Sequence, residues 1–140
     1  MFTDMTITPY LYYADVRAAL QWLTKGFGFT RYGTQMTGTD GTVNHAAMQF
    51  RDAVVMMGGP GAKYKNPRRL GQATQSLYVM VDNVDKHFAR ARKCGGKVLE
   101  EPADTEYGHR RYGIEDPEGH QWYFAQEIKK KKSRKRPARR

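Results

Sequence analysis

The sequence contains very little cysteine and has no long apolar run. Its 140 residues include a single cysteine, Cys94, which excludes an internal disulfide framework and any zinc site built from several thiolates. The longest uncharged apolar runs are short, as in Ala53–Met57, whereas a membrane-spanning helix needs about 18 consecutive apolar residues. The first residues, Met1–Asp4, lack the basic region followed by an apolar stretch that marks a signal peptide. We therefore expect a cytoplasmic protein with no membrane span.

Acidic residues are missing from the last part of the chain. Residues 129–140 hold nine Lys/Arg and no Asp/Glu, whereas the other 128 residues hold 15 Lys/Arg and 14 Asp/Glu. The net charge of +10 therefore belongs almost entirely to this tail, and the near-neutral body gives no reason to expect a nucleic-acid-binding face. A basic segment that cannot bury apolar surface is expected to be disordered. Two interpretations remain open: a solvated appendage, or a nonspecific contact to nucleic acid or anionic lipid.

A repeat with a spacing of about 68 residues organises the rest of the chain. The segment Tyr10–Val16 is similar to Tyr78–Val84. Each copy contains a polar residue, Asp15 or Asn83, that is typical of a helix N-cap. Apolar residues then recur at helical spacing in both copies. A glycine follows each predicted helix, as is common just past a helix C-terminus.

Each copy continues with three short segments that are rich in strand-forming residues. They are Phe29–Gln35, Asn44–Phe50 and Ala53–Gly58 in the first copy, and Val98–Glu101, Arg111–Glu115 and Gln121–Gln126 in the second. The sequence thus predicts one α+β domain over residues 1–128, with a β-α-β-β-β module at 5–58 and another at 75–128. The linker at 59–74 contains glycine, proline and basic residues, so we expect a mobile loop near the mouth of a site.

Three groups of residues occupy regular places in this arrangement. They are Pro9–Asp15 with Ala18–Phe29, Val43–Ala46 with Val54–Gly58, and Tyr107–Phe124, which includes the turn Asp116-Pro117-Glu118-Gly119. Together they resemble the glyoxalase/bleomycin-resistance/dioxygenase (vicinal oxygen chelate) superfamily over about residues 6–127. The resemblance implies two βαβββ modules whose concave sheets form a half-barrel cup around one small-molecule cavity, commonly in a homodimer. It also implies a divalent metal in the cup of the superfamily's enzymes.

The positions that the resemblance assigns to metal ligands carry weak donors in this sequence. They are Thr8, Gln49 (or Ala47 in another reading of that strand), Ser76 and Tyr123. This set has no carboxylate and no imidazole, and neutral hydroxyl and amide groups do not hold a divalent ion tightly. The four histidines are His45, His87, His109 and His120. No pair of them has a helical i,i+4 spacing with a nearby acid, so we expect neither a metal nor a cofactor.

Alternation along a strand indicates which side chains would face the cavity. By this rule Thr8, Tyr10 and Tyr12 share one face, whereas Trp122 and Phe124 point toward the helices. Tyrosine rings can stack on planar ligands, although the same residues are also common as plain sheet formers. The predicted ligand-binding residues are Thr8, Tyr10, Tyr12, Gln49, Ser76, Tyr78, Arg110 and Tyr123.

Arg110 is the one charged residue that we predict in the site. It lies in the motif Tyr-Gly-x-Arg-x-Tyr, where a guanidinium could clamp a carboxylate or stack on a ring. The alternative is a structural ion pair with Glu106 or Glu115. Cys94 has no visible catalytic His–Asp arrangement around it and is expected to be inert. No catalytic residue is predicted.

Three functions remain open from the sequence. The preferred one is a metal-free small-molecule-binding protein that sequesters a planar aromatic compound or an antibiotic, a role that only the resemblance implies. The second is a lyase, isomerase or dioxygenase-like enzyme that uses Tyr and Arg side chains or a divalent metal site. The third is a nucleic-acid accessory protein whose basic tail, 129–140, matters most.

Overall fold

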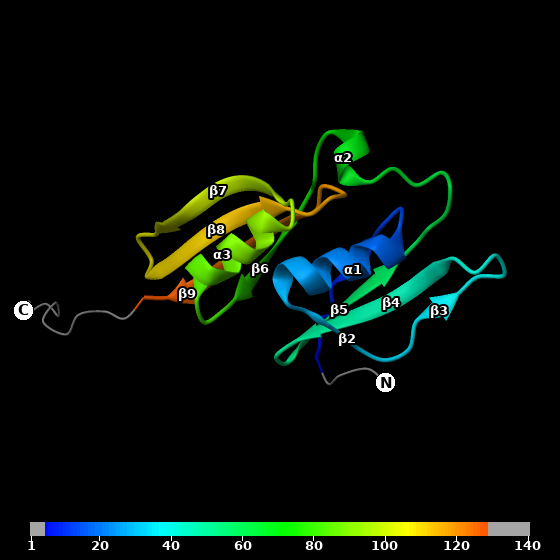
Figure 1. The fold of residues 1–140 in the computed structure, drawn as a ribbon, viewed down its shortest axis with the longest axis horizontal. Coiled ribbons are helices and arrows are strands. Elements are labelled where there is room, and N and C mark those ends of the chain that lie inside the picture. Colours follow the sequence, from blue (N-terminus) through cyan, green and yellow to red (C-terminus); the bar gives the residue numbers. More distant parts are fainter. Residues whose placement is uncertain (1–4, 129–140) are drawn as a thin grey trace, which may run out of the picture.

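The computed structural model describes residues 5–128, in which two β-α-β-β-β modules lie side by side (Figure 1). Module one comprises β1 (Tyr10–Tyr12), α1 (Val16–Phe27), β2 (Thr30–Arg31), β4 (Val43–Phe50) and β5 (Ala53–Gly58), with an additional two-residue strand, β3 (Met36–Thr37), between β2 and β4. Module two comprises β6 (Ser76–Met80), α3 (Val84–Lys93), β7 (Lys97–Asp104), β8 (His109–Glu115) and β9 (Gln121–Glu127). The short helix α2 (Pro67–Leu70) lies between the modules. The predicted fold is confirmed, and the predicted basic tail lies outside the described residues.

Each module forms its own mixed sheet, in which the first strand pairs in parallel with the last. β1 runs parallel to β5 and places Tyr10 opposite Met56, while β6 runs parallel to β9 and places Tyr78 opposite Tyr123. The strand orders are β1-β5-β4-β2, with β3 also paired to β4, and β6-β9-β8-β7. All other neighbouring strands are antiparallel. The strands β1 and β6 are therefore edge strands, each with one side open to other groups.

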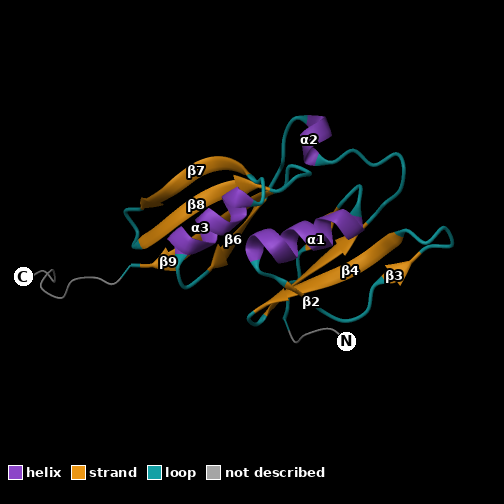
Figure 2. Cartoon of the chain, in the orientation of Figure 1, coloured by secondary structure: helices purple, strands orange, loops and turns teal. Residues whose placement is uncertain are grey.

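One long helix covers one face of each sheet (Figure 2). Both helices begin as predicted, because the side chain of Asp15 accepts a hydrogen bond from the amide of Ala18 and that of Asn83 from the amide of Lys86, each at 3.0 Å. Helix α1 ends at Phe27 and is followed by Gly28, whose φ of 80° is a left-handed conformation that favours glycine. No helix of residues 5–128 covers the opposite face of either sheet, and we call this face the uncovered face of that module.

The helix-facing sides of the two sheets share one apolar core. The ring of Phe27 lies 5.2 Å from that of Trp122 and 4.6 Å from that of Phe124, so module one packs directly on module two. His87 joins this contact, with Nε2 at 3.0 Å from the carbonyl oxygen of Phe27 and Nδ1 at 2.6 Å from the hydroxyl of Tyr112. Burial lowers the pKa of His87 to about 4, because the imidazolium loses its hydration. A neutral imidazole therefore bridges the modules.

A buried carboxylate also ties the modules together. Asp116 is 1% exposed and accepts hydrogen bonds from the Tyr13 hydroxyl at 2.6 Å and from Nε1 of Trp122 at 3.1 Å. The backbone amides of Glu118 and His120 donate to its other oxygen at 3.1 and 3.0 Å. Because Tyr13 belongs to module one, this carboxylate fixes the start of α1 against the turn of module two.

The same turn caps the N-terminus of α1. The carboxylate of Glu118 accepts hydrogen bonds from the amides of Ala14 and Asp15 at 2.7 and 2.9 Å. Negative charge at a helix N-terminus is favourable, because the unpaired amides there carry partial positive charge. The turn residues that the sequence analysis singled out therefore have a structural role at the boundary between the modules.

Two features of the fold differ from the predicted elements. The linker contains the helix α2, which Arg68 fastens to module two. The backbone amide of Arg68 donates to the carbonyl of Glu118 at 3.0 Å, and its side-chain Nε donates to the carbonyl of Pro117 at 2.7 Å. This part of the linker is therefore packed on module two and is not a structureless loop. The predicted strand Phe29–Gln35 is reduced to β2, because Gly33 turns the chain with a φ of 71°. Within residues 5–128, no helix is long and apolar enough to cross a membrane.

Candidate functional site

The two uncovered faces carry exposed tyrosines. On β1, Tyr10 and Tyr12 are 46% and 52% exposed, whereas Leu11 between them is buried. On β6, Tyr78 is 45% exposed. Trp122 of β9 is buried on the side of the helices, as the alternation predicts. The rings therefore point to the side of each sheet that the predicted cavity should occupy.

A cluster of aromatic and polar side chains occupies the uncovered face of module two. The hydroxyl of Tyr78 lies 2.8 Å from Nδ1 of His109 and 3.3 Å from the hydroxyl of Tyr107. Nη1 of Arg111 donates to the Tyr107 hydroxyl at 3.2 Å, and the guanidinium lies 5.1 Å from the centre of the Tyr123 ring. Tyr78, Tyr107, His109, Arg111 and Tyr123 are called the tyrosine cluster below.

Gly113 makes room for the tyrosine cluster in the middle of β8. It pairs with Tyr123 of β9, and a Cβ atom on Gly113 would overlap the Tyr123 ring. The ring thus lies flat across the backbone of the neighbouring strand, where a larger residue would push it away. A glycine inside a strand often marks such a close approach.

Module one carries a smaller counterpart of this arrangement. The hydroxyl of Tyr10 lies 2.9 Å from Nδ1 of His45. The ring of Tyr12 lies 6.0 Å from that of Tyr64, whose hydroxyl donates to the carbonyl of Tyr12 at 2.9 Å. Both edge strands therefore present a tyrosine that contacts a histidine from another strand. Among the residues that the structure describes, only module two adds an arginine, Arg111, to this arrangement.

A cleft of about 390 Å³ lies between the modules and is mostly apolar. Module one contributes Met5, Ile7, Pro9, Phe29, Met48, Gln49, Phe50, Arg51, Asp52, Ala53, Val54 and Val55, and module two contributes Leu77, Tyr78, Val79, Met80 and Trp122. Its size is within the range of small-molecule sites. Of the predicted ligand-binding residues, the cleft brings together Gln49 and Tyr78. Because Tyr78 also belongs to the tyrosine cluster, it connects the apolar cleft to the polar groups.

Comparison with known proteins identifies the family. The model of the Glyoxalase/Bleomycin resistance protein/Dioxygenase superfamily matches residues 5–124. The chain belongs to this superfamily. The predicted resemblance is thus confirmed, although the family name alone does not give a ligand.

Individual relatives of this superfamily member agree with the assignment. The uncharacterized protein Mb0911c of Mycobacterium bovis is 29% identical over 131 residues, which cover 90% of this chain and 86% of that protein. The crystal structure of TioX from Micromonospora sp. ML1 has a TM-score of 0.72 and 29% identity, covering 89% of this chain and 100% of TioX. A glyoxalase-related enzyme from Fulvimarina pelagi, with a TM-score of 0.66, 19% identity and 88% coverage of each chain, shares the fold.

The residues that we predicted at the superfamily's metal positions do not have the chemistry that a divalent ion needs. Thr8 precedes β1, Gln49 lies on β4, Ser76 begins β6 and Tyr123 lies on β9. The side-chain amide of Gln49 donates to the carbonyl of Arg51 at 3.4 Å. None of the four offers a carboxylate or an imidazole, which are the usual oxygen and nitrogen ligands. Among residues 5–128, no three His, Cys, Asp or Glu side chains are grouped to hold a metal.

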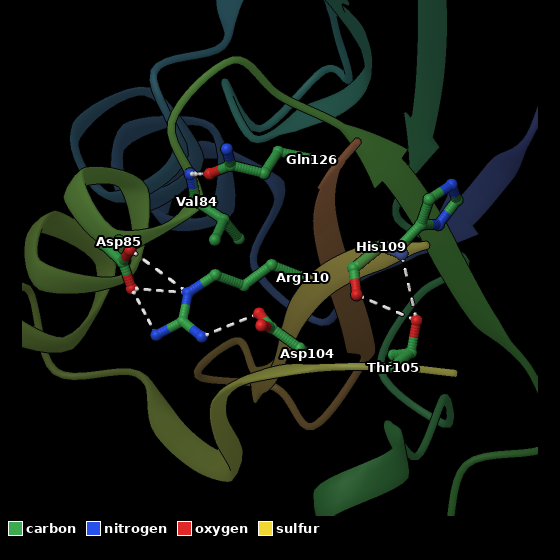
Figure 3. A network of polar contacts seen from close by, with 7 residues as sticks. All are labelled: Val84, Asp85, Asp104, Thr105, His109, Arg110 and Gln126. Carbon is green, nitrogen blue, oxygen red and sulfur yellow. Dashed lines mark hydrogen bonds and ion pairs between the residues drawn. The ribbon is translucent and has the colours of Figure 1, made fainter. Parts of the chain in front are cut away.

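Arg110 lies on the helix-covered face of β8 and does not join the tyrosine cluster. Its Nη2 donates to Asp85 of α3 at 3.1 Å and its Nη1 to Asp104 at 3.0 Å. Figure 3 shows Arg110 reaching toward Asp85, while the side chain of His109 points the other way. The structural ion pair that the sequence left open is therefore present, with partners other than the predicted Glu106 and Glu115. The guanidinium beside the tyrosines belongs to Arg111.

The sequence analysis missed Tyr107, His109 and Arg111. Tyr107 lies in the turn before β8, and its ring folds back to 5.2 Å from the ring of His109. The alternation of side chains along β8 could have predicted the position of Arg111, because Tyr112 and Ile114 are large apolar residues that should face the helices. By the same alternation, Arg111 had to face the tyrosines.

Proposed function

We propose that the cleft binds a small planar aromatic molecule without a metal ion, and that the protein acts by holding this molecule. The cleft between the modules carries the proposal. Apolar side chains from both modules line it, so burying a ligand there removes apolar surface from water on both sides. Three aromatic residues, Phe29, Phe50 and Tyr78, are among those that line the cleft, and aromatic rings can stack on a planar ligand.

A few polar groups in the cleft support recognition of one orientation of the ligand. Gln49 offers an amide, and Arg51 and Asp52 offer charges at the turn between β4 and β5. A mostly apolar site with a small number of polar groups is the usual design for a flat organic ligand. The weak donors at the superfamily's metal positions support binding that needs no metal. We also propose that this binding takes place in the cytoplasm, in keeping with the single cysteine.

We further propose that two copies of the chain form a homodimer through the uncovered faces. Tyr10, Tyr12, Tyr78 and Tyr107 are 46%, 52%, 45% and 60% exposed. Exposed aromatic side chains, here on the uncovered face of each sheet, are typical of interaction surfaces. Sedimentation velocity should give the mass of a dimer, and Tyr12→Glu should shift the protein toward the monomer. A monomer at all concentrations would contradict this proposal.

The binding proposal can be tested by quenching of tryptophan fluorescence. Trp122 lines the cleft, so acridine and 2-naphthol should quench the emission with saturation, equally with and without EDTA. Ala53→Phe fills the cleft and should weaken binding at least about tenfold, which corresponds to 1.4 kcal/mol. The matched control is Ala62→Phe, because Ala62 lies in an exposed part of the linker. Equal affinities for the two variants, or binding only after metal is added, would refute the proposal.

A further inference from the structure

The two charged residues that line the cleft differ in whether their charge is neutralised. They are Arg51 and Asp52, in the turn between β4 and β5. Nη2 of Arg51 donates to the carboxylate of Asp82 at 2.5 Å, so the positive charge in the cleft is already paired. Within residues 5–128, the carboxylate of the exposed Asp52 has no hydrogen-bond or ion-pair partner. The charge that remains free in the cleft is therefore negative.

Negative charge also prevails in the hollow next to the cleft. Arg51 borders this hollow too, together with Asp82 and Glu127. In the part of the chain that the structure describes, the carboxylate of Glu127 has no hydrogen-bond or ion-pair partner. One guanidinium and three carboxylates, those of Asp52, Asp82 and Glu127, therefore line the cleft and this neighbouring hollow.

The basic residues nearby belong to a different hollow. Lys86 and Arg90 of α3 line a hollow that Arg51 also borders, but neither of them lines the cleft. Arg90 donates to the carbonyl oxygens of Lys25 and Thr24 at 2.7 and 3.2 Å, so its charge is directed at the C-terminal end of α1. These residues therefore do not offset the free carboxylate within the cleft itself.

The apolar lining of the cleft is also suited to a positive charge. The guanidinium of Arg51 lies 5.3 Å from the centre of the Phe50 ring, so one planar cation already contacts an aromatic residue of the lining. Phe29 and Tyr78 add two more aromatic rings to the cleft. The face of an aromatic ring attracts a cation, because its electron density gives that face a partial negative charge.

We propose that the cleft selects a planar aromatic cation, and that Asp52 is the residue that determines this specificity. The inference rests on the proposed binding function and names the charge of the ligand. The flat ring system of such a ligand removes apolar surface of the cleft from water. A charge that is delocalised over rings is weakly hydrated, as in a guanidinium, so burying it costs less than burying a compact ammonium group. Asp52 remains exposed at the turn and does not have to lose its own hydration.

Three probes with one ring system and different charges test the specificity of the full chain. At about pH 8, acridine is neutral, 10-methylacridinium is a cation and acridine-9-carboxylate is an anion, and equilibrium dialysis gives a dissociation constant for each. The cation should bind about fivefold or more tightly than acridine, and the anion more weakly than acridine. These differences should shrink when NaCl is raised from about 0.05 M to about 0.5 M, because salt screens exposed charges.

Two variants then test the role of Asp52. Asp52→Asn should weaken binding of 10-methylacridinium about 3–5-fold, which is the size of an exposed ion pair, and should leave binding of acridine unchanged. Unchanged acridine binding also shows that this variant is folded. The matched control is Asp40→Asn, which removes the same charge from an exposed turn that does not line the cleft. The control should bind all three probes like the wild type.

The outcomes separate this inference from the binding proposal. Saturable binding of acridine, with the cation bound no more tightly or the anion bound most tightly, would overturn the charge specificity and leave binding in the cleft intact. A preference for the cation that persists in Asp52→Asn, or that falls equally in Asp40→Asn, would overturn the role of Asp52. Absence of saturable binding for all three probes would overturn the two proposals together. A cation preference that falls in Asp52→Asn alone would support both.

Discussion

Replacing Asp116 by asparagine should remove a large part of the contact between the modules. The amide oxygen of Asn can accept from the fixed backbone amides of Glu118 and His120, which leaves its NH₂ group facing Tyr13 and Trp122. The Tyr13 hydroxyl can rotate and accept from the new NH₂, but Nε1 of Trp122 can only donate and loses its acceptor. A buried donor without a partner costs about 1–3 kcal/mol.

The loss of charge changes the remaining bonds as well. Hydrogen bonds to a charged acceptor contribute about 1.5–3 kcal/mol each, against about 1 kcal/mol for neutral ones. Burial raises the pKa of Asp116, so removing the charge also relieves some desolvation. Together these effects give a decrease of about 2 kcal/mol in the free energy of unfolding, or about 8 °C in Tm for a domain of this size.

Urea denaturation followed by circular dichroism provides the assay. The matched control is Asp40→Asn, because Asp40 lies in an exposed turn where it accepts from the amide of Thr42 at 2.9 Å, and an Asn side chain can keep that bond. The control should change stability by less than about 0.5 kcal/mol. If Asp116→Asn is no more destabilising than the control, the buried carboxylate does not tie the modules together and the reasoning fails.

Three further predictions concern pH, backbone strain and the tail. The pKa of His87 is about 4 in the folded protein, below its ordinary value of 6.5. The stability that the neutral imidazole contributes is therefore present above pH 6.5 and is lost as the pH falls toward 4. Urea titrations should show that the free energy of unfolding falls by about 3 kcal/mol over this range in the wild type and not in His87→Gln. Gly119→Ala should lower Tm more than Gly41→Ala. Both glycines have a positive φ, of 94° and 83°, but a Cβ at Gly119 would lie 2.6 Å from the Arg68 amide nitrogen, whereas a Cβ at Gly41 would meet no atom within 4 Å. Equal Tm values would contradict this. Changing Lys129–Lys132 to Gln should weaken binding to double-stranded DNA in anisotropy titrations and flatten the plot of log K against log salt by about 4; an unchanged slope would show that these charges do not contact the DNA.

Much of the fold could be predicted because its signals are local and occur twice. Asp15 and Asn83 are recognisable as N-caps from residue type and position, and each structure-forming segment has a counterpart about 68 residues away. The exposed tyrosines of β1 could be assigned to one face for a similar reason. A strand alternates strictly, so one buried neighbour such as Leu11 fixes the orientation of the residues on both sides.

The site itself depended on contacts that local patterns do not show. The cleft lies between two modules, which pack on each other through Phe27, Trp122 and Phe124, residues almost a hundred positions apart. The tyrosine cluster depends on a turn that folds Tyr107 back over β8 and on a choice between two adjacent arginines. A shift of one residue along a strand exchanges its faces, so Arg110 pairs with α3 while Arg111 joins the tyrosines.

Methyl NMR of the methionines would measure binding in the cleft most directly. The chain has seven methionines; Met48 and Met80 line the cleft, whereas Met36 is 58% exposed on β3 and does not line it. Titration with acridine in EDTA should shift the methyl signals of Met48 and Met80 with one common saturation curve and leave that of Met36 in place. Shifts confined to Met36, or shifts at Met48 and Met80 that require an added divalent metal, would contradict metal-free binding between the modules.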